Sequence, residues 1–181
     1  MQTSTIRKIL HRIYIRLHKL EPEESIIHIG RQARLDQALI DAAYHGETMK
    51  IGPLLDAGAD IDVRSKSGMT PLMWAAKKGY AETCALLLEK GADIDATDNC
   101  GRTALIYTGI WGGLEACKLL VEHGADINVM DAQHNHTARM VANDIGRPSV
   151  VAYLGRMEGS YNLIGKERFS TFLLAFNECV V

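Results

Sequence analysis

Apolar and polar residues in the middle of the chain follow a helical spacing in short stretches that end at glycine. The first complete stretch begins after Thr70 and ends at Gly79. Thr70 can cap a helix whose first position is Pro71, where the missing N–H costs nothing, and Gly79 suits the left-handed residue that ends a helix. The pattern therefore predicts a helix of barely two turns between these residues.

A second helix is predicted from about Ala81. Cys84, Leu87 and Leu88 fall on one face at helical spacing, and Gly91 ends the helix before an aspartate-rich turn. The residues that follow, up to Gly101, predict an extended finger. One unit is thus a helix, a turn, a second helix and a finger.

This unit is repeated along the chain. The phrase Gly-Ala-Asp-Ile-Asp/Asn begins at Gly58, Gly91 and Gly124, so each copy starts 33 residues after the last. A period of this length marks a supersecondary unit that cannot bury its apolar face alone, so neighbouring units must stack. We therefore expect function on the surface of the stack.

The repeated motif resembles the ankyrin repeat, whose pattern includes a Thr-Pro-Leu-His start, a mid-unit glycine and a Leu-Leu pair followed by Gly-Ala-Asp. The chain has Thr70-Pro71-Leu72 and Gly79 at these places, but Met73, Ile106 or Met140 replaces the histidine of the family. The resemblance implies an all-α fold: an ankyrin-repeat α-solenoid of helix-turn-helix units with β-hairpin fingers, flanked by N- and C-terminal amphipathic helices.

The repeat domain is expected over residues 35–157. Its units cover about residues 35–64, 65–97, 98–130 and 131–157. Arg139 replaces the core residues Leu72 and Leu105 in the last unit, which marks the outward face of a terminal capping unit. Residues 1–34 are assigned to a basic N-terminal helix and linker, and residues 158–181 to a C-terminal tail or capping helix.

Charge is unevenly distributed. The net charge is −2, but residues 1–20 hold five Lys/Arg and no acid, which leaves 15 Lys/Arg against 22 Asp/Glu in the rest. Apolar residues recur in this leader at helical spacing, so it predicts a basic amphipathic helix. The helix caps the incomplete first unit, attaches to an anionic membrane surface or serves as an organellar transit peptide. No run of 18 apolar residues or secretion signal appears, so the expected location is cytoplasmic.

The C-terminal tail carries a second apolar stripe. Phe169, Phe172, Leu173 and Phe176 share one face of a predicted short amphipathic helix. Packing against the last unit is expected, because exposed stripes of this kind are liabilities in soluble monomers. Docking of a partner is the alternative.

The residues with reactive side chains predict no enzyme. Cys84 and Cys117 occupy the same place in adjacent units, where helix axes about 8–10 Å apart are too distant for a disulfide, so we expect reduced core thiols. The sequence has no phosphate-binding loop, zinc-protease motif, nucleophile elbow or kinase signature. His134-Asn135-His136 is the one metal-like cluster, without a further ligand at the required spacing. We predict no catalytic residue, cofactor or metal.

A protein partner is expected on the concave side, which the resemblance places at the finger tips and the exposed residues of each first helix. The candidate residues are Tyr44, His45, Lys66, Met69, Lys77, Lys78, Arg102, Ile110 and Trp111, with Ser67, Asn99, Asp144 and Ile145 at equivalent positions. Trp, Tyr and Arg dominate binding hot spots, so this mixture suits a partner with an apolar anchor and an acidic rim.

Trp111 is the candidate anchor. The alternative is that its ring lies back against Gly112 and Gly113. The Lys77-Lys78 pair is interpreted as a solvated face of an acidic array, and no nucleic acid is expected. The leading hypothesis is a monomeric, non-catalytic interaction module, and the second is a membrane-attached or organelle-targeted adaptor located by residues 1–20.

Overall fold

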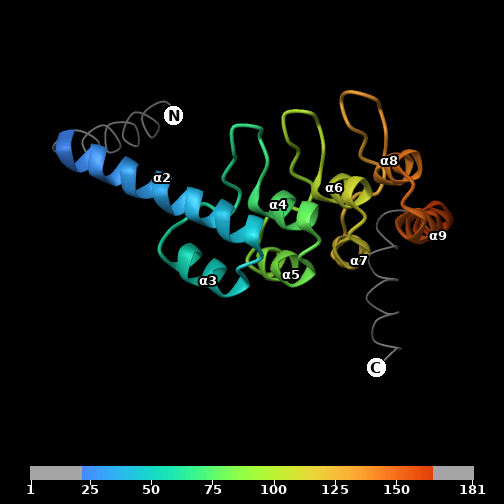
Figure 1. Ribbon diagram of the computed structural model, residues 1–181, viewed down its shortest axis with the longest axis horizontal. Coiled ribbons are helices and arrows are strands. Elements are labelled where there is room, and N and C mark those ends of the chain that lie inside the picture. The colour runs from blue at the N-terminus through green and yellow to red at the C-terminus, as the bar shows by residue number, and fades with distance from the viewer. Residues whose placement is uncertain (1–21, 165–181) are drawn as a thin grey trace, which may run out of the picture.

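The computed structural model describes residues 22–164, which form helices and loops without a strand (Figure 1). The helices are α2 (Pro22–His45), α3 (Thr48–Asp56), α4 (Pro71–Lys78), α5 (Ala81–Glu89), α6 (Ala104–Trp111), α7 (Leu114–Glu122), α8 (Ala138–Ile145) and α9 (Pro148–Ile164). Of these, none is both long and apolar enough to cross a membrane.

The helices form two rows (Figure 1). Helices α2, α4, α6 and α8 make an inner row next to three projecting fingers, and α3, α5 and α7 make an outer row. Adjacent inner helices pack against each other, and each inner helix packs against the helix that follows it in the chain, which for α8 is α9. The predicted all-α solenoid of stacked helix-turn-helix units is confirmed.

The inner helices begin and end as their sequences predict. Thr70, Thr103 and Thr137 each accept a hydrogen bond on the side-chain oxygen from a backbone N–H three residues later, at 3.4 Å in every case. The helices end at glycines with positive φ, a conformation that costs little without a Cβ. These glycines are Gly46, Gly79, Gly112 and Gly146.

The apolar core lies between the two rows. Leu72 and Leu105 are 1% exposed, and both predicted core thiols, Cys84 and Cys117, are 0% exposed and unbridged. Burial raises the pKa of Cys84 to about 12 and that of Cys117 to about 11. Both are therefore protonated at neutral pH, and their predicted place in the core is confirmed.

Aspartates join each unit to the next. Asp62 Oδ1 accepts a hydrogen bond from the backbone N–H of Asp93 at 3.0 Å, and Asp95 Oδ1 accepts from that of Asp126 at 2.9 Å. Asp93 Oδ1 also accepts from the N–H of Asp95 within its own turn, at 3.1 Å. The repeated Gly-Ala-Asp-Ile-Asp phrase thus builds both the turn and the joint between units.

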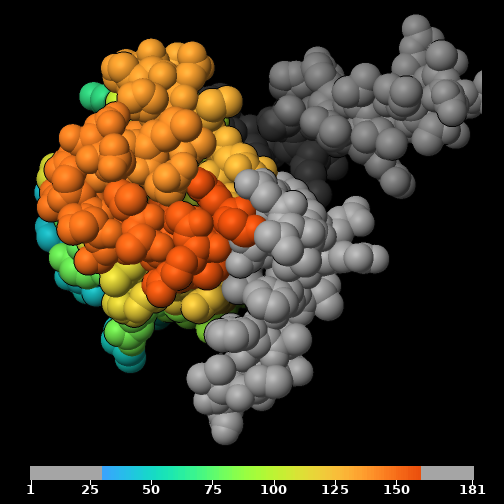
Figure 2. Space-filling view, turned by 90° about the vertical axis from the view of Figure 1, so that its right-hand side faces the viewer, coloured from blue at the N-terminus to red at the C-terminus, as the bar shows by residue number. Residues whose placement is uncertain are grey.

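The end of the stack is closed by α8 and α9 (Figure 2). Val150 and Leu154 of α9 are 1% exposed and extend the core. Arg139 of α8, at the place of a core leucine, is partly exposed and its Nε lies 2.7 Å from Glu158 Oε2. These contacts are typical of a terminal repeat that turns a polar face outward.

Helix α2 is continuous from Pro22 to His45, so residues 22–34, assigned from the sequence to the leader and its linker, are helical. The basic leader of residues 1–20 and the apolar stripe of residues 169–176 lie outside the described residues. Their alternatives, including membrane attachment, stay predictions.

Candidate functional site

The three fingers lie side by side and are hydrogen-bonded to each other. Ser67 O accepts a hydrogen bond from Asn99 N at 3.2 Å, and Cys100 O accepts from Ala132 N at 2.9 Å. Each finger is also closed at its base by a backbone bond, which links Ser65 to Met69, Asp98 to Arg102 and Asp131 to His136. The predicted β-hairpins are therefore loops that form a continuous wall, without a strand between residues 22 and 164.

A row of eight side chains runs along the foot of this wall. Each inner helix contributes the two residues before its final glycine: Tyr44, His45, Lys77, Lys78, Ile110, Trp111, Asp144 and Ile145. All eight are at least partly exposed. We call this set the groove row, and the surface between it and the fingers the groove. The exposed positions predicted on the inner helices are all found here.

One of the binding residues predicted on the fingers is wrong. Lys66 is exposed and Arg102 is partly exposed, as a binding surface requires. Met69 is only 3% exposed, because its side chain packs into the core while its carbonyl oxygen closes the finger. Met69 is therefore a core residue and not a contact for a partner.

Aromatic rings and lysines meet in the middle of the groove. Lys77 Nζ lies 4.7 Å from the ring centroid of Trp74, 5.4 Å from that of Trp111 and 6.0 Å from that of Tyr107. Ammonium groups over aromatic faces at such distances are held by cation–π attraction. We call these residues, together with Tyr44 and Lys78, the aromatic–lysine cluster. It fixes the position of a positive charge that stays accessible.

Tyr44 and Trp111 give the cluster its exposed edges. Lys78 Nζ lies 4.2 Å from the Tyr44 centroid, and the Tyr44 ring meets that of Trp74 edge-on at 5.4 Å. Trp111 is 54% exposed. More than half of this large ring is thus available to a partner, which favours the anchor interpretation over packing against Gly112 and Gly113.

The charge of the groove differs from that of the outer row. Helices α4 and α6 contain no Asp or Glu, and neither Lys77 nor Lys78 makes an ion pair with any residue between 22 and 164. The outer helices α5 and α7 each carry two glutamates. The overall negative charge therefore hides a cationic patch in the groove.

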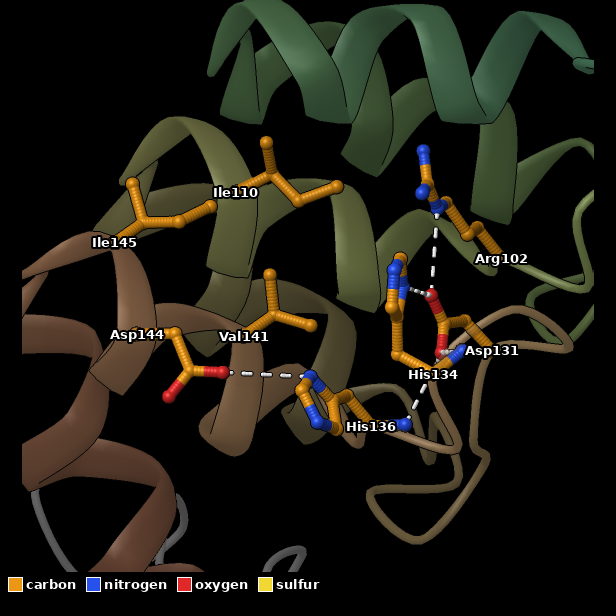
Figure 3. Close-up of a pocket in the computed structure, with 8 residues that line it drawn as sticks. All are labelled: Arg102, Ile110, Asp131, His134, His136, Val141, Asp144 and Ile145. Atoms are coloured by element: carbon orange, nitrogen blue, oxygen red, sulfur yellow. Dashed lines mark hydrogen bonds and ion pairs between the residues drawn. The ribbon is translucent and has the colours of Figure 1, made fainter.

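A cavity of about 390 Å³ opens at the α8 end of the groove (Figure 3). Ile110, Val141 and Ile145 form its apolar side. Its polar side is formed by Arg102, Asp131, His134, His136 and Asp144. We call this cavity the end pocket.

Asp131 organises the polar side of the end pocket. The carboxylate is 3% exposed and accepts hydrogen bonds from the backbone N–H of His136 at 3.0 Å and of His134 at 3.1 Å. His134 Nδ1 lies 3.4 Å and Arg102 Nε 3.7 Å from its other oxygen. Burial alone raises the pKa of the Asp131 carboxyl, but the hydrogen bonds from His136 and His134 outweigh it and hold the pKa below its usual value.

His136 faces the other acid of the pocket, with its Nδ1 3.3 Å from Asp144 Oδ2. The rings of His134 and His136 lie 5.7 Å apart. In the part of the chain that the structure describes, no group of three or more His, Cys, Asp and Glu side chains could hold a metal ion. The polar groups of the pocket are instead paired with one another.

The end pocket exists because one side chain is small. In the preceding unit, Tyr107 fills the space beside the finger and donates its hydroxyl proton to Asp98 Oδ2 at 2.7 Å. Val141 occupies the equivalent place in the last unit. It follows Tyr107 by 34 residues, the same interval that separates the helix caps Thr103 and Thr137. Valine cannot reach Asp131, so the space stays open.

Sequence reasoning missed the end pocket as a unit. It considered His134 and His136 only as metal ligands, and it gave Asp131 and Val141 no role. The available signal was the change from Tyr107 to Val141 beside an unchanged aspartate.

Comparison with known proteins finds a matching family. A protein-family model described as ankyrin repeats, in three copies, matches residues 39–131. The search of the curated proteins finds no match.

Proposed function

Because the chain belongs to the ankyrin repeat family, whose repeats generally mediate protein–protein interaction, we propose that its groove binds a protein partner. The family fold is a non-catalytic interaction fold. In the groove, the acids and imidazoles of the end pocket are paired with one another, an arrangement that suits recognition by a preformed surface without a chemical step.

The exposed ring of Trp111 is the observation that carries this proposal. It is 54% exposed in the groove row, and Lys77 Nζ lies 5.4 Å from its ring centroid within the aromatic–lysine cluster. A large aromatic ring that is exposed beside fixed charges is typical of a binding hot spot, because its burial removes much apolar surface from water.

Substitution of Trp111 tests the proposal. We expect Trp111→Ala to leave the circular dichroism spectrum unchanged and to weaken partner capture by about 2 kcal/mol or more. Met49, on α3 in the outer row, is 89% exposed and supplies the matched control Met49→Ala. The measurement is quantitative mass spectrometry of proteins captured by the intact chain and by each variant. Equal loss in both variants, or no loss in Trp111→Ala, contradicts binding in the groove.

A further inference from the structure

We propose that the groove selects an extended protein segment in which an acidic residue and an aliphatic residue stand about four positions apart, an inference that depends on the proposed function. The acidic side chain pairs with Lys77 and Lys78. The aliphatic side chain enters the end pocket beside Val141.

Charge complementarity requires the acidic residue. Lys77 and Lys78 have no anionic partner within the described residues, and neither their own helix α4 nor the adjacent α6 contains an acid. The rings of Trp74 and Trp111 already hold the Lys77 ammonium in place. A carboxylate that pairs with it gains electrostatic attraction without ordering a long side chain, and a cationic segment is repelled.

The shape and chemistry of the end pocket require the aliphatic residue. Its open volume is about 390 Å³, and its apolar side consists of Ile110, Val141 and Ile145. Ile145 is 48% exposed, so an entering methyl-bearing side chain covers apolar surface that water now contacts. An acidic side chain would instead compete with Asp131 and Asp144 for donors that they already hold, and a basic one would compete with His136 and Arg102 for these acids.

The spacing follows from the stacking of the helices. The two lysines lie on α4, and the end pocket lies between α6 and α8. Packed helix axes about 8–10 Å apart place these two points about 12–15 Å apart. An extended chain rises about 3.3 Å per residue, so about four residues cover this distance, and an even number keeps both side chains on one side.

Selection from a random peptide library on the immobilised full chain tests the proposal. The displayed peptides have about twelve residues, which in extended form exceed the span of the groove. We expect enrichment of Asp or Glu about four positions from Leu, Ile or Val. The selected peptides are then measured in solution by fluorescence anisotropy.

Three variants assign each preference to its residues. The double variant Lys77→Glu/Lys78→Glu is expected to exchange the acidic preference for Lys or Arg and to keep the aliphatic one. Val141→Tyr fills the pocket and is expected to abolish the aliphatic preference alone. Lys90→Glu, an exposed charge reversal at the end of α5, is the matched control and leaves both preferences unchanged.

Other outcomes overturn the inference. Peptides without the acidic–aliphatic pair, or with the pair about nine positions apart as in a helical ligand with a rise of about 1.5 Å per residue, contradict it. If such peptides still lose binding in Trp111→Ala, the proposed function stands and only the inference fails. If no selected peptide depends on Trp111, both fail.

Discussion

Asp98 in the third unit and Asp131 in the fourth stand 33 residues apart at the same place in their fingers, and both are buried. Asp98 accepts hydrogen bonds from two backbone N–H groups and from the hydroxyl of Tyr107. Asp131 keeps two backbone bonds, but its remaining oxygen contacts His134 and Arg102 on the wall of a cavity. An aspartate at the same place in the unit thus lies beside filled space in the third unit and lines the end pocket in the fourth.

The difference shows how a repeat protein acquires a distinct site without a change of scaffold. In both fingers the backbone N–H of the aspartate donates the closing bond, but it reaches Arg102, four residues on, from Asp98 and His136, five residues on, from Asp131. The last unit thus differs by one added finger residue, by the histidines that follow Asp131, and by the change from Tyr107 to Val141 on the inner helix. A pocket therefore forms where the side chain that fills the space is lost and the polar group to which it was hydrogen-bonded is kept.

Removal of the two aspartates should have unequal effects. Asp98→Ala leaves three donors without their acceptor, at about 1 kcal/mol each, so we expect the free energy of unfolding to fall by about 3 kcal/mol. Asp131→Ala leaves two backbone donors without an acceptor, while the largely exposed imidazole of His134 can bond to water instead. We therefore expect the free energy of unfolding to fall by about 2 kcal/mol. Urea unfolding followed by circular dichroism measures both. A larger loss for Asp131→Ala would mean that the finger of the fourth unit is the more tightly held.

Val141→Tyr should make the fourth unit resemble the third. The new ring fills the end pocket, and its hydroxyl can donate to Asp131, so we expect a gain in stability of up to about 1 kcal/mol. The reciprocal change, Tyr107→Val, should open a cavity beside Asp98 and destabilise the protein. Thermal unfolding compares the two variants. A marked loss of stability in Val141→Tyr would show that the space is too tight for the ring.

The ionisation of Asp131 should also make stability depend on pH, with a smaller effect than the substitutions above. Its folded-state pKa lies below the usual value, so its contribution is fully present above the unfolded pKa of about 3.9 and is lost as the pH falls through the folded pKa. In Asp131→Asn, we expect a smaller loss of unfolding free energy between about pH 5 and the acid transition. Urea titrations at several pH values measure the slope. Identical slopes in both proteins would contradict the lowered pKa.

The regular parts of the fold could be predicted from the sequence because their causes are local. Thr70 and Gly79 cap a helix through bonds within one turn of the backbone. Cys84 lies on the apolar face of a helix, which any stacked unit must bury. The groove row was found for the same reason, since a residue just before a terminal glycine has a fixed direction in every unit.

The failures have causes that are not local. Met69 stands at a finger, but its side chain turns into the core, and its sequence neighbours do not encode that direction. The end pocket depends on the size of Val141 relative to a finger residue from another part of the unit. Such a relation appears only when the two segments are placed together.

The aspartate joints between units have a consequence for the growth of the array. In each joint the acceptor is a side chain, Asp62 or Asp95, while the donor is a main-chain N–H of the next unit. Every residue except proline supplies that donor. A tandem copy of residues 65–97 could therefore form the same aspartate-to-backbone hydrogen bond at both new borders. The array could lengthen without any new type of contact between units.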